Sequence, residues 1–212
     1  MKKIIVFGAS GGTGRAVVTQ AIEKGLEVTA ILRNPAALDL RHHHLKIVIG
    51  DVLQLSSFES EVAEKDAVIS CIGSGKNLKP TSIYSKGIDN ILQAMRINNV
   101  HRLVCISAGG VEATKEMGFF IRSLTHLVLQ RILKNLYTDM LLMESTLERS
   151  SLDWTVLRPA RLTDQPLTKK YRTGVRTHLK TPWCISRSDV AHYMLTIIDD
   201  PKTFHFKIEI AY

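Results

Sequence analysis

Short apolar runs alternate along this chain with longer segments in which apolar residues recur every three to four positions. A short run is typical of a buried strand, and the longer spacing is typical of an amphipathic helix. We therefore predict strands at Ile4–Phe7, Glu27–Leu32, Leu45–Ile49, Asp66–Ile72, Arg102–Ile106, Asp153–Pro159 and Phe204–Ala211. Because strands and helices alternate, the pattern predicts an α/β fold with a doubly wound parallel sheet.

The segments between these strands predict helices at Arg15–Lys24, Pro80–Asn98, Phe119–Leu136 and Thr138–Arg149, and from Ser186 or Ser188 to Asp199. The Phe119–Leu136 stretch could form a lid over a substrate, a dimer surface or an extra helix docked on the sheet. The stretch Lys169–Lys180 alternates and predicts a strand or hairpin. Its cations could steer an anionic substrate or form a solvated face.

A glycine-rich turn, Gly8-Ala9-Ser10-Gly11-Gly12-Thr13-Gly14, joins the first predicted strand to the first predicted helix. In such a turn one glycine allows a sharp exit from the strand, one lets a pyrophosphate approach the backbone, and one packs the helix on the strand. The helix N-terminus adds free N–H groups and a positive dipole. The turn therefore indicates a dinucleotide site, and its GxxGxxG spacing favours the loop of short-chain or extended dehydrogenases.

Polar residues at the ends of the next strands refine this hypothesis. Arg33 stands about where an NAD-preferring site would place an Asp or Glu, and a guanidinium there can bind a 2′-phosphate instead. We therefore expect NADP(H), with a solvated loop cation as the alternative. Asp51 could accept a hydrogen bond from the adenine amino group or cap the following helix. Gly73 and Ser74 begin a second glycine turn at the same edge of the sheet.

Composition narrows the class of protein. The 212 residues include 28 Lys plus Arg against 20 Asp plus Glu, so the protein should attract anions. The cations are scattered and no nucleic-acid motif occurs, which favours a phosphate-bearing cofactor over nucleic acid. No apolar run approaches the ~20 residues of a membrane span. The apolar run near the N-terminus is interrupted at Gly8, so it is too short for a signal peptide. We expect one cytoplasmic domain over residues 1–212, without a membrane partner.

No metal site is expected. Cys71, Cys105 and Cys184 are too few and too widely spaced for a metal cluster or a disulfide framework. The first two are expected to pack as small hydrophobic side chains. We interpret the run His42–His44 as a polar loop, because three consecutive residues of a strand or a helix cannot all face one ion.

Several separated segments resemble the NADPH-dependent biliverdin-IXβ reductase and flavin reductase family, a group of atypical short-chain dehydrogenases. They are Gly8–Gly14, Arg33, Val48–Gln54, the stretch that begins with Asn77–Thr81 and continues to Asn90 and Ile91, Asp164–Thr168, Ile185 and Ser186, Asp189, and His192–Leu195. The resemblance covers nearly the whole chain. It implies a single Rossmann-like doubly wound parallel sheet with a small C-terminal portion on the substrate side.

The same resemblance implies roles for individual residues. Ser107 matches a serine near the nicotinamide and the substrate, although it could simply satisfy the end of its strand. The 2′-phosphate would lie on Arg33 and the adenine by Asp51 and Val52. The remaining positions expected to bind the cofactor are Gly8, Ser10, Gly11, Gly12, Thr13, Gly14, Gly73, Ser74, Cys105 and Leu162.

The chain departs from the family pattern in its candidate acid–base groups. Arg161 replaces a histidine, so a permanent cation stands where an imidazole could titrate near neutral pH. Arg161 could hold an acidic substrate or the phosphates of the cofactor, and with Ser107 it is a candidate catalytic residue. The tyrosine and lysine pair of short-chain dehydrogenases is also missing, since Leu141 stands one helical turn after Tyr137. Alcohol oxidation and epimerase chemistry are therefore disfavoured.

We expect hydride transfer from NADPH to a planar acceptor, a flavin or a tetrapyrrole, and the basic composition is compatible with an anionic one. FMN, riboflavin and biliverdin-like molecules are examples of such acceptors. Solvent can supply the proton in such a reduction, so positioning does most of the catalysis. The alternative is a non-catalytic NADP(H)-binding sensor or regulatory protein. Either a monomer or a homodimer is compatible with the sequence.

Overall fold

The computed structural model describes residues 1–75, 81–109, 130–175 and 177–212. Within these ranges eight strands form one sheet in the order β3-β2-β1-β4-β5-β6-β10-β8. Only β8, at the edge, is antiparallel to its neighbour. The strands are β1 (Lys3–Phe7), β2 (Glu27–Leu32), β3 (Leu45–Ile49), β4 (Ala67–Ser70), β5 (Arg102–Ile106), β6 (Asp153–Pro159), β8 (Arg172–Val175) and β10 (Phe206–Ala211). The prediction of a doubly wound α/β sheet is confirmed.

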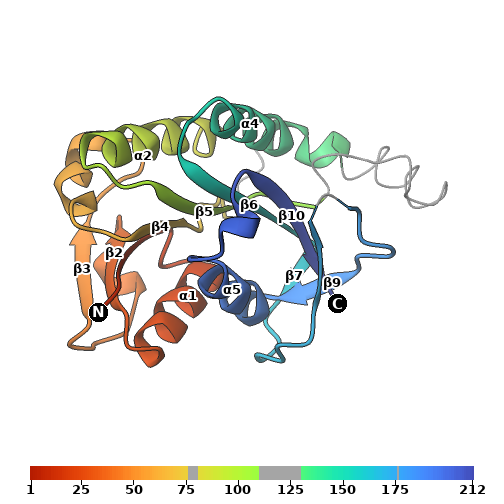
Figure 1. Ribbon diagram of the computed structural model, residues 1–212, viewed down its shortest axis with the longest axis horizontal. Coiled ribbons are helices and arrows are strands. Elements are labelled where there is room, and N and C mark those ends of the chain that lie inside the picture. The colour runs from red at the N-terminus through yellow and green to blue at the C-terminus, as the bar shows by residue number, and fades with distance from the viewer. Residues whose placement is uncertain (76–80, 110–129, 176) are drawn as a thin grey trace.

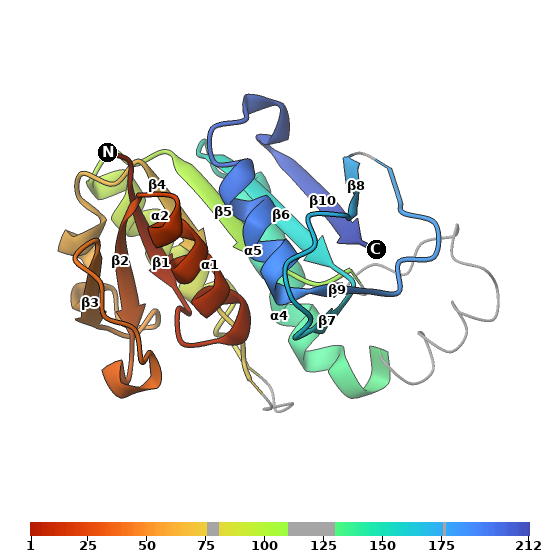
Figure 2. The same cartoon turned by 90° about the horizontal axis from the view of Figure 1, so that it is seen from below.

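Helices cover both faces of the sheet. Helices α2 (Ser85–Ile97) and α4 (Gln130–Glu148) lie on one face, and α1 (Gly12–Glu23) and α5 (Arg187–Thr196) lie on the other (Figures 1 and 2). Ile5 and Phe7 of β1 pack into the layer under α2 and α4, whereas Ile4 and Val6 pack into the layer over α1 and α5. Because both faces are buried, the strand is apolar without alternation.

The bounds of α4 and α2 differ from those expected. The sequence predicted a break near Tyr137, but α4 runs unbroken from Gln130 to Glu148, and the expected segment before Gln130 lies outside the described residues. Tyr137, Met140 and Leu147 bury the core side of this helix at helical spacing. Helix α2 begins at Ser85, later than the expected start, and Pro80 is itself outside the described residues.

The start of α2 is set by a contact from another helix. The carboxylate of Asp139 on α4 accepts hydrogen bonds from the backbone N–H groups of Tyr84, at 2.9 Å, and Ser85, at 3.2 Å. These donors have no partner within their own helix, so Asp139 does the work of an N-cap. A cap supplied from 54 residues away along the chain leaves no local sequence signal.

The C-terminal part adds short strands beside β6. Strands β7 (Arg161–Thr163) and β9 (Cys184–Ser186) pair in parallel as a separate small sheet. Strand β8 occupies only part of the alternating stretch Lys169–Lys180, in which residue 176 is not described. Ser186 caps α5 through its Oγ, which accepts from the backbone N–H of Asp189 at 2.9 Å, and α5 ends at Thr196, before the expected end.

No helix in the described ranges is long and apolar enough to cross a membrane.

Candidate functional site

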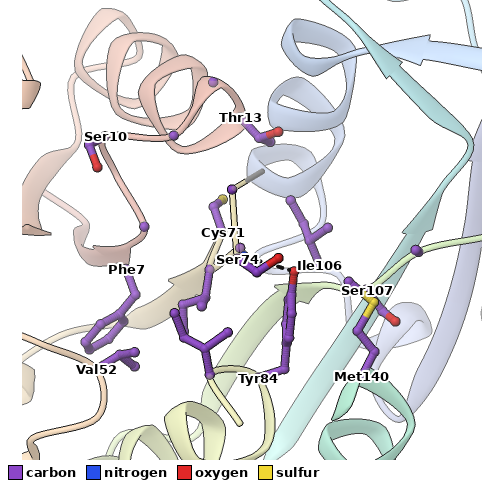
Figure 3. Close-up of a pocket in the computed structure, with 18 of the residues that line it drawn as sticks. Phe7, Ser10, Thr13, Val52, Cys71, Ser74, Tyr84, Ile106, Ser107 and Met140 are labelled. Atoms are coloured by element: carbon purple, nitrogen blue, oxygen red, sulfur yellow. Dashed lines mark hydrogen bonds between the residues drawn. The ribbon is translucent and has the colours of Figure 1, made fainter. Parts of the chain in front are cut away.

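A cleft of about 900 Å³ opens at the carboxyl ends of the central strands. It lies where α1 and α2 leave the neighbouring strands β1 and β4 toward opposite faces of the sheet, which is the usual ligand position in a doubly wound fold. Figure 3 shows Ser10 and Thr13 on the α1 side of the cleft, with Tyr84, Ser107 and Met140 on the other side. Its size suits a small-molecule or cofactor site.

The glycine turn forms one wall of this cleft. Gly8 has φ +72°, and a Cβ there would lie 2.4 Å from the carbonyl oxygen of Cys71, so only glycine fits the exit of β1. A Cβ on Gly14 would lie 2.2 Å from the carbonyl oxygen of Gly8. Gly14 therefore packs α1 on β1 and does not line the cleft, whereas Gly8, Ser10, Gly11, Gly12 and Thr13 do.

The N-terminus of α1 is open to an anion. Its N-cap residue, Gly11, offers no side-chain hydrogen bond, and the first turn contains no acidic residue. Gly11 and Gly12 are exposed at the cleft. Free N–H groups and the helix dipole at such an end bind phosphate groups readily.

The expected adenosine side is assembled from the ends of β2 and β3. Arg33 is exposed and lines the cleft with Asp51 and Val52. Oδ1 of Asp51 accepts from the backbone N–H of Leu53 at 2.9 Å, which closes a local turn. Asp51 caps no α-helix, because a short 3-10 turn with Gln54 as its N-cap follows it.

Tyr84 supports the second glycine turn. Its hydroxyl oxygen accepts from the backbone N–H of Ser74 at 3.3 Å, the contact dashed in Figure 3. Asp139 fixes the backbone of Tyr84, so α4 indirectly positions the wall formed by Gly73 and Ser74. Burial raises the pKa of the Tyr84 phenol, which keeps it protonated at neutral pH.

Ser107 carries a buried hydroxyl without a protein partner. The residue follows β5, lines the cleft and is 3% exposed, and its backbone N–H donates to the carbonyl oxygen of Leu157 at 2.8 Å. Its Oγ has no hydrogen-bond partner among the described residues. Burying an unpaired hydroxyl is unfavourable, so this atom is available to hydrogen-bond a ligand or a water in the cleft.

Besides Gly14, two expected site residues are absent from the cleft lining. Cys105 is fully buried in the core under α2 and α4, where burial raises the pKa of its thiol, and Cys71 lines the cleft instead. Burial raises the pKa of Cys71 to about 12, so this thiol stays protonated. Arg161 is exposed on β7 and is not among the lining residues, although its neighbour Leu162 is.

The structure adds a cleft residue that the sequence reasoning missed. Arg187, the first residue of α5, lines the cleft beside Gly12. Packing of α5 against α1 brings it there, helped by a 2.9 Å hydrogen bond from Nε2 of Gln20 to the carbonyl oxygen of Ser188. The available signal was a single arginine after a helix cap, which does not by itself indicate a site.

The histidine run forms a tighter group than expected. The three residues lie in a loop and turn, and their ligand atoms all lie within 4.8 Å of one another. Because the run is neither a strand nor a helix, the geometry that would keep three consecutive side chains from facing one ion does not apply to it. The group lies at the amino ends of β2 and β3, since the carbonyl oxygen of His44 accepts from Val28 N–H. It is not part of the cleft.

Curated relatives cover the chain only in part. The mitochondrial 40 kDa subunit of NADH-ubiquinone oxidoreductase from Neurospora crassa is 27% identical over 127 residues, which are 54% of this chain and 33% of that protein. An uncharacterised chloroplastic protein of Arabidopsis thaliana is 28% identical over 175 residues, which are 79% of this chain and 61% of that protein. The chain thus spans less than two thirds of the length of either relative.

Solved structures share the fold over nearly their whole length. A Rossmann-fold NAD(P)-binding family protein from Shigella flexneri superposes with a TM-score of 0.73 at 24% identity, covering 99% of this chain and 93% of that chain. A wide-type short-chain dehydrogenase/reductase from Veillonella parvula, in complex with NADP, gives a TM-score of 0.80 at 17% identity, with 100% and 94% covered. Residues 8–201 match the family described as NAD(P)H-binding, and the chain belongs to that family.

Proposed function

We propose that the protein is an NADPH-dependent oxidoreductase that transfers hydride to a planar acceptor, a flavin or a tetrapyrrole. The family match and the oxidoreductase-like fold support the nucleotide half of this proposal. The single observation that carries the catalytic half is the buried, unpartnered hydroxyl of Ser107 in the cleft. A resemblance in several separated sequence segments to biliverdin-IXβ and flavin reductases supports the choice of acceptor.

Residues of the cleft fit the parts of such a cofactor. The open N-terminus of α1 suits the diphosphate, and Arg33 suits a 2′-phosphate because its guanidinium can form paired charge-assisted hydrogen bonds. The bound nicotinamide would supply the hydride. Ser107 would hold the reacting partner by donating its hydroxyl hydrogen. Thus binding and orientation are the main contributions of the protein.

Proton transfer would come from solvent. Tyr137 is a poor acid or base, because it is packed in the core and burial raises the pKa of its phenol. The described lining of the cleft contains neither histidine nor lysine. The same observation favours the alternative function, a non-catalytic NADP(H)-binding sensor, because it leaves few groups for acid–base chemistry.

A direct assay separates these functions. Purified protein is titrated with NADPH and then mixed in turn with FMN, riboflavin and biliverdin while absorbance of the reduced nicotinamide is followed. Acceptor-dependent decay would establish the reductase and rank its acceptors. Tight NADPH binding without decay for any acceptor would favour the sensor, and absence of binding would contradict both.

Replacing Ser107 by alanine should slow turnover about tenfold and leave the Kd for NADPH within about twofold, the cost of one lost hydrogen bond to the reacting partner. Steady-state kinetics and a binding titration on the same preparation measure both quantities. Ser70→Ala is the matched control, since Ser70 is as buried on the neighbouring strand but does not line the cleft. Unchanged turnover in the Ser107 variant would return this hydroxyl to a structural role.

Replacing Gly14 by alanine should destabilise the protein by about 1–3 kcal/mol, because the new methyl group meets backbone atoms that cannot rotate away. The turn must shift, so NADPH and NADH should both bind about tenfold more weakly. Urea unfolding and nucleotide titrations test this. Gly25→Ala is the control for lost stability away from the cleft, because Gly25 has φ +76°, where alanine is strained, but does not line the cleft; it should leave nucleotide affinity unchanged. Equal nucleotide affinity in both variants would show that this packing does not shape the cleft.

A further inference from the structure

We propose that Arg187 and Asp164 form a charge latch beside the diphosphate position, in which Arg187 exchanges the carboxylate of Asp164 for the diphosphate of the bound nucleotide. This inference rests on the nucleotide-binding half of the proposed function and does not depend on the acceptor. It gives the cleft a second cation besides Arg33. The two cations would contact different parts of the cofactor, since Arg187 lies by α1 and Arg33 follows β2.

The Arg187 side chain packs against the N-terminal end of α1. A Cβ built on Gly12 would come within 2.5 Å of Cδ and 2.9 Å of Nε of Arg187, so the side chain lies directly on the first turn of α1. Both residues line the cleft. The guanidinium is therefore at the helix end whose free N–H groups are available to an anion.

Arg187 lies between the positive end of α1 and the carboxylate of Asp164. A cation beside the positive end of a helix dipole is unfavourable unless an anion lies between or beside them. Here Asp164 provides that anion, with its Oδ1 2.6 Å from Nη1 of Arg187. The side chain of Asp164 is 87% exposed, and an exposed ion pair contributes little to stability. A diphosphate placed at the helix end carries more charge and can replace it.

Helix α5 holds part of the chain segment that follows Asp164. Asp189 of α5 is fully buried and accepts hydrogen bonds from the backbone N–H groups of Thr168 and Lys169, at 3.1 and 2.6 Å. Burial opposes its charge, but these and other hydrogen bonds lower the pKa of Asp189 below its usual value. The chain at Thr168 and Lys169 is thus tied to α5, so rotation of the Arg187 side chain can break the contact with Asp164 while this backbone stays in place.

The latch predicts opposite effects for its two halves. Arg187→Ala should weaken NADPH and NADH equally, by about tenfold, because both share the diphosphate and one charge-assisted contact is lost. Asp164→Asn should tighten both by about threefold, because Arg187 no longer has a competing carboxylate. In the Arg187→Ala background, Asp164→Asn should have no further effect on either Kd, which is the signature of a coupled pair.

Fluorescence titrations of the full chain with NADPH and NADH measure these constants, and thermal melts confirm that each variant is folded. Arg15→Ala is the charge-matched control, since Arg15 is on α1 but donates to the carbonyl oxygen of Ala37 and does not line the cleft. Asp164→Asn remains informative if Arg187→Ala fails to fold. Unchanged Kd values in Arg187→Ala, or an Asp164→Asn effect that persists without Arg187, would overturn the latch while nucleotide binding by the wild type stood. A wild type that binds neither nucleotide would overturn both.

Discussion

Arg33→Ala is expected to weaken NADPH binding by about 100-fold while changing NADH binding by less than about threefold. A guanidinium bound to a phosphate makes charge-assisted hydrogen bonds worth about 1.5–3 kcal/mol each, and only NADPH carries the 2′-phosphate. Arg33 is exposed at the cleft mouth, so it can meet that phosphate without rearrangement of the core. Parallel titrations with the two nucleotides measure the selectivity directly.

Arg41→Ala provides the control for this experiment, because Arg41 is exposed in the same connection between β2 and β3 but does not line the cleft. Loss of that charge should leave both affinities nearly unchanged. Arg33→Asp should go further and favour NADH, since a carboxylate at this position can accept from the ribose hydroxyls. Equal weakening of NADPH and NADH by Arg33→Ala would contradict a 2′-phosphate contact. The latch predicts that Arg187→Ala weakens NADPH and NADH binding equally, so the variants of the two arginines are distinguishable.

Most of the fold could be predicted from local patterns in the sequence. The apolar run before Gly8 predicted β1, and Glu27–Leu32, Leu45–Ile49, Arg102–Ile106 and Asp153–Pro159 predicted four further strands with the observed bounds. These strands are buried on both faces, so their residues are apolar almost without interruption. The glycine turn was also a local signal, because backbone conformation and close approach at Gly8 and Gly14 restrict those positions to glycine.

Features set by tertiary contact could not be predicted in this way. The start of α2 depends on Asp139 from α4, and Arg187 reaches the cleft because α5 packs against α1. The resemblance placed Cys105 with the cofactor, but its side chain is buried in the core, and Cys71 lines the cleft instead. Arg161, which replaces the family's histidine, was expected to hold an acidic substrate or the phosphates of the cofactor, whereas it lies exposed on the short strand β7, outside the cleft lining.

A buried ion pair joins α4 to the sheet. Glu144 of α4 is 1% exposed, and its carboxylate accepts from Nε of Arg158 on β6 at 3.1 Å and from Nη2 of the same side chain. Nζ of Lys207 on β10 lies 3.3 Å from the same carboxylate. Burial lowers the pKa of Lys207, but the carboxylates of Glu148 and Glu144 outweigh it and hold that pKa above its usual value.

Glu144→Ala is therefore expected to lower the free energy of unfolding by about 3–5 kcal/mol, because it removes a buried carboxylate that accepts two hydrogen bonds from the Arg158 guanidinium. Urea unfolding followed by circular dichroism measures the change, with the midpoint shifting and the slope unchanged. Glu148→Ala is the matched control: Glu148 pairs with the same Lys207 at 2.7 Å but is half exposed, so its loss should cost less than about 1 kcal/mol. Glu144→Gln should fall between the two, because it keeps hydrogen-bonding atoms and removes only the charge. Equal costs for Glu144→Ala and Glu148→Ala would show that burial does not strengthen this pair.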